Sequence, residues 1–211
     1  MKPSYKGFEA KQNTGNYITL PPVGAYEAEI QAVRFTPKNE DENIFRDTIE
    51  LMIEITEGEY ANRYHEVYEN QKERFGDSIK YKGIFKLYPP VEGEESYDWR
   101  KSVFEGNLWA VSESNGKNAD GSYKYNWDWD EKKLKGKKVG INVREYLYTY
   151  NGKERSTTEI GRFETIQDVR DGKCRTLKPR DKRKDKDESD EEASTDGSGF
   201  TDVSSEVSVP W

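Results

Sequence analysis

Apolar and polar residues alternate along three segments in the first third of the chain, at residues 25–35, 47–56 and 60–70. Alternation with a period of two is typical of a β-strand that buries one face and exposes the other. The pattern is clearest between Ile49 and Ile55, where every second residue is apolar. We therefore predict three β-strands before residue 71.

A longer alternation runs from Val139 to Tyr150, and the dipeptide Asn151-Gly152 follows it, with Lys153 to Phe163 as the expected partner strand. Asn-Gly supplies the two positive-φ residues that a type I′ turn requires, so we predict a β-hairpin over 139–163. Apolar residues fill most of one face of its first strand. The other face carries Arg144, Tyr146, Tyr148 and Tyr150.

Residues 98–113 fit a helix instead, because Phe104, Leu108 and Val111 recur at the spacing of one helical face. The region 71–90 mixes basic and aromatic residues and matches neither period. The predicted order is therefore three strands, one helix and then the two strands of the hairpin.

Short antiparallel strands around a single helix that follows the third strand describe an OB-fold, a small five-stranded barrel. We therefore predict a mainly β protein with one OB-fold-like barrel. The alternative is a generic α+β sheet crossed by one helix.

The composition divides the chain into two parts. Of the 211 residues, 32% are hydrophobic and 36% are charged, and a chain this polar cannot place its whole length in a packed core. Residues 187–211 hold eight acidic and no basic residues, whereas residues 1–186 hold 34 basic and 33 acidic ones. We predict a globular domain at 1–172 and a disordered acidic tail at 173–211.

Several classes of function lack support in the sequence. Cys174 is the one cysteine, which excludes an intrachain disulfide and favours a reducing cytoplasmic compartment. His65 is the one histidine and has no metal-binding motif around it, and phosphate-binding glycine loops and nucleophile-elbow motifs are absent. No apolar run approaches the length of a membrane span, and a signal-peptide pattern is missing. We therefore expect a binding protein rather than an enzyme, with no cofactor and no membrane partner.

Aromatic and basic residues lie close together in three places, which indicates a surface for single-stranded nucleic acid. Flat rings stack on unpaired bases, and cations contact the phosphates between them. The alternative is that the tyrosines pack on half-buried strands, where they are common. The candidate nucleic-acid-binding residues are Arg144, Tyr146, Tyr148 and Tyr150 on the hairpin, Lys72, Arg74, Lys80 and Lys82 in the basic segment, and Tyr123, Tyr125, Trp127 and Trp129 before the second basic turn.

The last three residues of the sequence are Val209, Pro210 and Trp211. Proline restricts the conformations of an unfolded peptide, and tryptophan offers a large apolar area and is enriched at binding hot spots. We predict that these residues form a partner-docking peptide. The alternative is a frayed end without a role.

These features together resemble those of bacteriophage single-stranded DNA-binding proteins. The resemblance rests on the terminal Val209-Pro210-Trp211, with Asp202 and Glu206 upstream, and on the strand segments 20–35 and 46–70. It implies an OB-fold that coats unpaired DNA during replication, recombination or repair. It also implies that the acidic tail recruits replication and recombination proteins, in the host cytoplasm if the protein is phage-encoded.

Two other functions stay open at this point. One is a protein-interaction adaptor whose sheet binds no nucleic acid, and the other is an RNA-binding OB-fold protein. An exposed edge strand is also compatible with a homo-oligomer.

Overall fold

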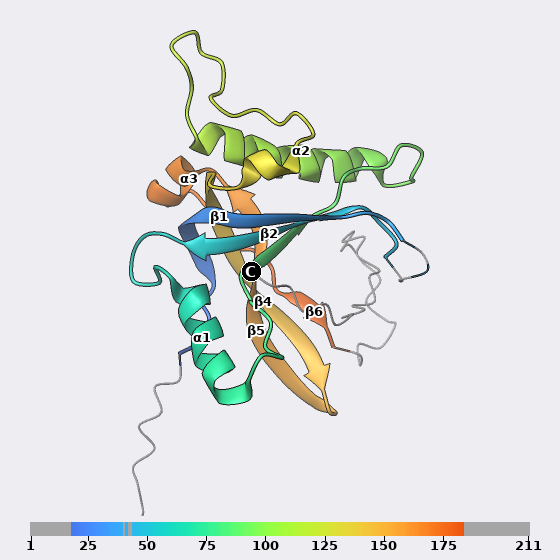
Figure 1. Ribbon diagram of the computed structural model, residues 1–211, viewed down its shortest axis with the longest axis vertical. Helices are drawn as coiled ribbons and strands as arrows, with labels where there is room; N and C mark the ends of the chain where they lie inside the picture. The colour runs from blue at the N-terminus through green and yellow to red at the C-terminus, as the bar shows by residue number, and fades with distance from the viewer. Residues whose placement is uncertain (1–17, 40, 42–43, 184–211) are drawn as a thin grey trace, which may run out of the picture.

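The computed structural model describes residues 18–39, 41 and 44–183, and within them the protein is mainly β (Figure 1). The described residues hold six strands, which form one sheet, and three α-helices and one 3-10 helix that join them. The strands are β1 (Gly24–Thr36), β2 (Thr48–Ile55), β3 (Ile84–Leu87), β4 (Lys138–Tyr150), β5 (Lys153–Glu164) and β6 (Arg180–Lys182). The helices are α1 (Arg63–Phe75), α2 (Tyr97–Ser114), the 3-10 helix η2 (Glu131–Leu134) and α3 (Ile166–Arg170).

The sheet follows the order β3-β2-β1-β4-β5, and β6 pairs in parallel with β4. The neighbouring strands along that path are antiparallel. The predicted mainly β class is therefore confirmed. Closure of the predicted OB-fold-like barrel is not established, because the hydrogen-bonded path of the described strands ends at β3 on one side and at β5 on the other.

The core forms where the predicted periodicities place apolar side chains together. Every second residue of β2 from Ile49 to Ile55 is buried, and so are all residues of β4 from Val139 to Val143. The helix α2 covers the sheet with the face that carries Phe104, Leu108 and Val111. The predicted helix at 98–113 thus corresponds to α2, and the predicted strands at 25–35 and 47–56 correspond to β1 and β2. Period-two and helical patterns were sufficient to find these three elements.

The predicted third strand at 60–70 is wrong, and so is the prediction of a single helix. Most of this segment belongs to α1, which lies between β2 and β3 and buries Tyr64 and Val67. A spacing of three residues fits one face of a helix, and the surrounding charged residues then point to solvent. The third strand of the structure, β3, lies in the segment 71–90, which matches neither period.

The predicted hairpin is confirmed. β4 and β5 pair from Gly140↔Glu164 to Tyr150↔Lys153, and Asn151 and Gly152 at the turn have φ of 50° and 69°. Positive φ at both turn residues is the condition of a type I′ turn. In Figure 1 this hairpin extends toward one end of the long axis of the molecule, while α2 crosses the other end.

The fold extends beyond the predicted domain boundary at residue 172. Residues 173–183, which we call the return segment, run back along the hairpin and end in β6. These residues were predicted to belong to the disordered tail because they lack apolar periodicity, yet pairing with β4 through main-chain groups needs no such periodicity. The rest of the predicted tail, from 184 to 211, lies outside the described residues.

None of the helices in the described part of the chain has the length and apolar character needed to cross a bilayer.

Candidate functional site

The distal half of β4 leaves the body of the sheet. β1 pairs with β4 only from Lys138 to Val143, and beyond that point β6 takes the place of β1 as the neighbour of β4. The chain therefore forms a three-stranded arm in the order β5-β4-β6. We define the arm as residues 144–159 together with β6.

One face of the arm carries three tyrosines, as the alternation in β4 predicted. The rings of Tyr146 and Tyr148 are stacked, with centroids 5.6 Å apart and an angle of 15° between their planes. Tyr150, next to the turn, is 61% exposed. We call this surface the tyrosine face.

Cations from both neighbouring strands lie beside the tyrosines. Residues directly opposite each other in a ladder project from the same face of a sheet. Tyr146 is opposite Arg180 of β6, and the guanidinium carbon of Arg180 is 5.6 Å from the centre of that ring. Tyr148 lies between Lys182 and Arg155, and Tyr150 lies opposite Lys153. Each tyrosine therefore has at least one cation at its side.

The tyrosine face is strongly positive. Glu159 is the one carboxylate among its residues, and it accepts a hydrogen bond from Arg144 Nε at 2.8 Å and one from Arg180 at 3.4 Å. Arg155 and Lys153 are exposed and form no ion pair with any residue that the structure describes. The face thus presents five cations, Arg144, Lys153, Arg155, Arg180 and Lys182, against a single carboxylate.

The opposite face of the arm is different in charge. Glu154 and Asp181 lie there, and both are bound by Arg183, at 3.0 Å and 2.6 Å. The alternation of side chains along the strands therefore separates the tyrosines and most of the cations from the carboxylates. The resulting surface suits a ligand in which flat rings alternate with negative groups.

A second group of predicted basic residues lies at the end of α1 and in the segment that leads to β3, and the contacts of Lys72 are with residues of this region. Lys72 lies in the last turn of α1, where it pairs with Asp77 at 3.4 Å and lies 5.8 Å from the ring of Tyr68. Arg74, Lys80 and Lys82 are exposed. Lys72 and Arg74 thus lie at the end of α1, and Lys80 and Lys82 lie in the segment between α1 and β3.

The four aromatic residues predicted before the second basic turn have different environments. Tyr125 is a core residue with 5% exposure, so its ring is not available for stacking on a ligand. Trp127 is half-buried against the core, and Tyr123 accepts a hydrogen bond from Trp109 Nε1 at 3.2 Å. Prediction from sequence could not separate buried from exposed rings here, because the segment lacks a clear period.

Trp129 is the exposed member of this group. It has a φ of 67°, unusual for a residue with a side chain, and it is 69% exposed. Its ring stacks on Phe104 of α2, with centroids 6.1 Å apart. Since α2 crosses the end of the molecule away from the hairpin turn, Trp129 is remote from the tip of the tyrosine face (Figure 1).

Sequence reasoning missed two groups of residues. The cations Lys153, Arg155, Arg180 and Lys182 were not proposed as candidates, although the register of an Asn-Gly hairpin places Lys153 and Arg155 opposite Tyr150 and Tyr148. The exposed tryptophans of α2, Trp99 and Trp109, were also missed. Their positions outside the apolar stripe of the predicted helix were the available signal.

The cysteine and the possible metal ligands of the described residues add nothing to the tyrosine face. Burial raises the pKa of the Cys174 thiol, which makes it a weaker nucleophile. Among the described residues no group of three or more His, Cys, Asp or Glu side chains is arranged to hold a metal ion. The predicted docking residues Val209, Pro210 and Trp211 lie outside the described residues.

Comparison with known proteins gives no assignment: no protein-family model matches the chain, and no curated protein is significantly similar to it in sequence.

Proposed function

We propose that the protein binds single-stranded DNA without sequence preference, and that the tyrosine face is the binding surface. The observation that carries this proposal is the pairing of each tyrosine with a cation on the same face of the arm. Every base has a flat face that can stack on tyrosine, and every nucleotide carries a phosphate. A surface of rings and cations therefore recognises the polymer rather than its sequence.

The spacing of the tyrosines supports a stretched single strand as the ligand. Side chains two residues apart on a β-strand are separated by roughly 6.7 Å along its axis. Bases stacked on successive tyrosines must then be pulled apart from one another. Duplex DNA keeps its bases stacked and paired, so it presents no free base faces to such a surface.

The proposal includes an OB-fold for the folded domain. β3 and β5, the end strands of the sheet path, approach each other where the rings of Phe85 and Phe163 have centroids 4.4 Å apart. This contact is the one expected if the sheet curls into a partly open barrel. OB-folds bind oligonucleotides with the loop between their fourth and fifth strands among other segments, and the turn of the arm is that loop here.

Fluorescence anisotropy of end-labelled oligonucleotides tests the proposal. The label belongs on the nucleic acid, because the described tryptophans lie on α2 and the segment after it rather than on the arm. Oligo(dT) should bind, and log Kd should change with log salt concentration by about 0.7 per contacted phosphate. Duplex DNA of the same length should bind much more weakly.

Each other outcome of this titration assigns a different function. Absence of binding to oligo(dT), oligo(rU) and duplex DNA would contradict the proposal and favour a protein-interaction adaptor. Tighter binding of oligo(rU) than of oligo(dT) would favour an RNA-binding protein that reads the 2′-hydroxyl.

The proposed role is in DNA replication, recombination or repair, with partners recruited by the acidic C-terminal residues. The sequence alone supports this second part, since 184–211 lies outside the described residues. Replacing Trp211 by Ala should leave the affinity for oligo(dT) unchanged while reducing capture of replication or recombination proteins. Loss of oligo(dT) binding instead would place Trp211 in the DNA site.

A further inference from the structure

The cations on one side of the tyrosine face come from a segment that is held in place by a buried amide. Asn142, in β4, is 2% exposed. Its Nδ2 group donates one hydrogen bond to Glu164 Oε1 at 2.9 Å and another to the backbone carbonyl of Arg175 at 3.0 Å. An amide nitrogen has two hydrogens, and both are used here. Asn142 therefore ties the start of the return segment to β5.

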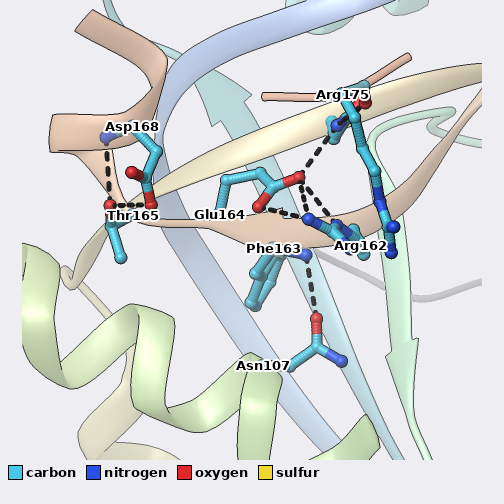
Figure 2. Close-up of polar contacts among 8 residues, drawn as sticks. Asn107, Arg162, Phe163, Glu164, Thr165, Asp168 and Arg175 are labelled. Carbon is cyan, nitrogen blue, oxygen red and sulfur yellow. Dashed lines mark hydrogen bonds and ion pairs between the residues drawn. The ribbon is translucent and has the colours of Figure 1, made fainter. Parts of the chain in front are cut away.

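The other partner of this amide is itself fixed. Glu164 is 8% exposed, and Arg162 donates two hydrogen bonds to it, each at 2.7 Å (Figure 2). The neighbouring Phe163 amide donates to Asn107 Oδ1 of α2 at 2.8 Å, as Figure 2 also shows. The end of β5 is thus joined to α2 and to the return segment. A network in which each buried polar group has partners is rigid, because moving one member leaves another unsatisfied.

Beyond Arg175 the return segment packs closely on the hairpin. A Cβ atom at Gly161 would lie 2.6 Å from Leu177 Cδ1 and 3.1 Å from Arg144 Cδ, so the absence of a side chain lets Leu177 lie directly on β5. Three residues later, Arg180 begins the pairing with β4. The segment is therefore guided onto the arm by two contacts before it reaches the tyrosine face.

β6 itself is too short to hold its own position. It has three residues, all half-buried, and isolated strand pairs of that size are not stable in water. Its register against Tyr146 and Tyr148 must therefore depend on the anchored part of the return segment. A shift of one residue would turn Arg180 and Lys182 to the opposite face and bring Asp181 to the tyrosines.

We propose that Asn142 is a positioning residue for the single-stranded ligand: by holding the Arg175 carbonyl, it sets the register in which Arg180 and Lys182 stand beside Tyr146 and Tyr148. The ligand would be an extended single strand whose bases stack on the two rings while two phosphates contact the β6 cations. This inference rests on the function proposed above. It adds that the binding surface is assembled from two distant parts of the chain.

The first test removes the β6 cations. The double variant Arg180→Gln with Lys182→Gln should bind oligo(dT) more weakly than wild type. The slope of log Kd against log salt should fall by about 1.4, from two lost phosphate contacts at about 0.7 each. The matched control carries Lys101→Gln and Lys117→Gln, two exposed lysines in and after α2, and should keep the wild-type slope. An unchanged slope in the β6 variant would overturn the inference.

The second test asks whether Asn142 acts through β6. Asn142→Ala should lower the salt slope by about the same 1.4. Combining it with the β6 double variant should lower the slope no further, because the cations it positions are already gone. Additive losses would show that Asn142 acts elsewhere and would refute its positioning role.

A buried substitution can unfold the protein, so a second route to the same effect is needed. Leu177→Ser loosens the return segment without touching the Asn142 network, and circular dichroism checks that both variants keep the β-sheet. Leu177→Ser should reproduce the loss of salt slope, and a wild-type slope in this variant contradicts the inference. If wild-type protein fails to bind oligo(dT), the proposed function itself fails. If it binds and the β6 variants behave as wild type, only the present inference fails.

Discussion

Glu50 joins three strands through one carboxylate. It lies in β2, accepts a hydrogen bond from Arg34 Nε of β1 at 2.8 Å and pairs with Lys86 of β3 at 3.2 Å. Burial raises the pKa of Glu50, but the hydrogen bond from Arg34 and the charge of Lys86 outweigh burial, so the pKa lies below its ordinary value of 4.5. The ionised carboxylate therefore stabilises this side of the sheet.

Replacing Glu50 by Gln should lower the free energy of unfolding at pH 7 by about 1.5–3 kcal/mol, the usual contribution of hydrogen bonds to charged groups. The pKa of Glu50 is depressed in the folded state, so its contribution is complete above pH 4.5 and disappears as pH falls through the folded-state value. Urea unfolding at several pH values measures this. A difference between variant and wild type that persists unchanged to pH 2 contradicts the account. The exposed Glu92→Gln serves as control.

Replacement by Ala should have opposite effects on stability at two of the glycines. A Cβ at Gly140 would lie 2.8 Å from the Glu164 carbonyl oxygen and 3.0 Å from that of Thr165, so Gly140→Ala should destabilise the protein by about 1–3 kcal/mol. At Gly106, inside α2, nothing lies within 4 Å of such an atom, and Gly106→Ala should stabilise by about 0.5–1 kcal/mol. Thermal unfolding of both variants checks the signs. Equal effects at the two positions would rule out close backbone approach at Gly140.

At the scale of the elements, local patterns were sufficient where neighbours in sequence are also neighbours in space. β2 has a buried face and a polar face, and the hairpin has Asn151-Gly152 between alternating strands, so both were predictable. α1 was misread because Tyr64 and Tyr68, read as one face of a strand, are four residues apart and suit one face of a helix equally. The free backbone amides at the start of α1 find their acceptor in Glu54 of β2, whose carboxylate accepts hydrogen bonds from the Tyr64 and His65 amides. No local pattern shows such a contact.

The candidate site was likewise predictable only where its residues are close in sequence. The tyrosines of β4 follow from alternation along one strand. The β6 cations required knowing that Arg180 pairs beside Tyr146, which is 34 positions earlier, and parallel pairing leaves no turn signal between its strands. The burial of Tyr125 could not be predicted because it depends on the core cluster that it joins and on Lys137, whose ammonium lies 5.2 Å from the ring centre, not on its neighbours in sequence.

Tyr150 should be the most accessible stacking ring of the arm, since it is 61% exposed. Tyr150→Ala should weaken oligo(dT) binding by about 1–3 kcal/mol, the usual value of one stacked base, with little change in salt slope because no cation is lost. Tyr123→Ala is the matched control, since the Tyr123 hydroxyl binds Trp109 on α2. Equal losses in both variants, measured by anisotropy, would remove the distinction between the arm and the α2 side.

At the scale of the whole molecule, the net charge does not show how charge is distributed over the surface that binds the ligand. The chain has a formal net charge of −7, yet all of this excess lies within 187–211, and the tyrosine face sets five cations against one carboxylate. Interactions between exposed charges fade beyond about 10 Å in 0.1 M salt, so a bound strand responds to the local surface rather than to the total. The fold achieves this by turning three of the four carboxylates of the arm, Glu145, Glu154 and Asp181, to its other face.

The most direct measurement is the position of photochemical cross-links between the wild-type protein and oligo(dT), identified by mass spectrometry of digested complexes. The account predicts cross-links on peptides that contain Tyr146, Tyr148 and Tyr150, and their loss when all three are replaced by Ala. Cross-links confined to the Trp129 and α2 region, with none on the arm, would contradict it.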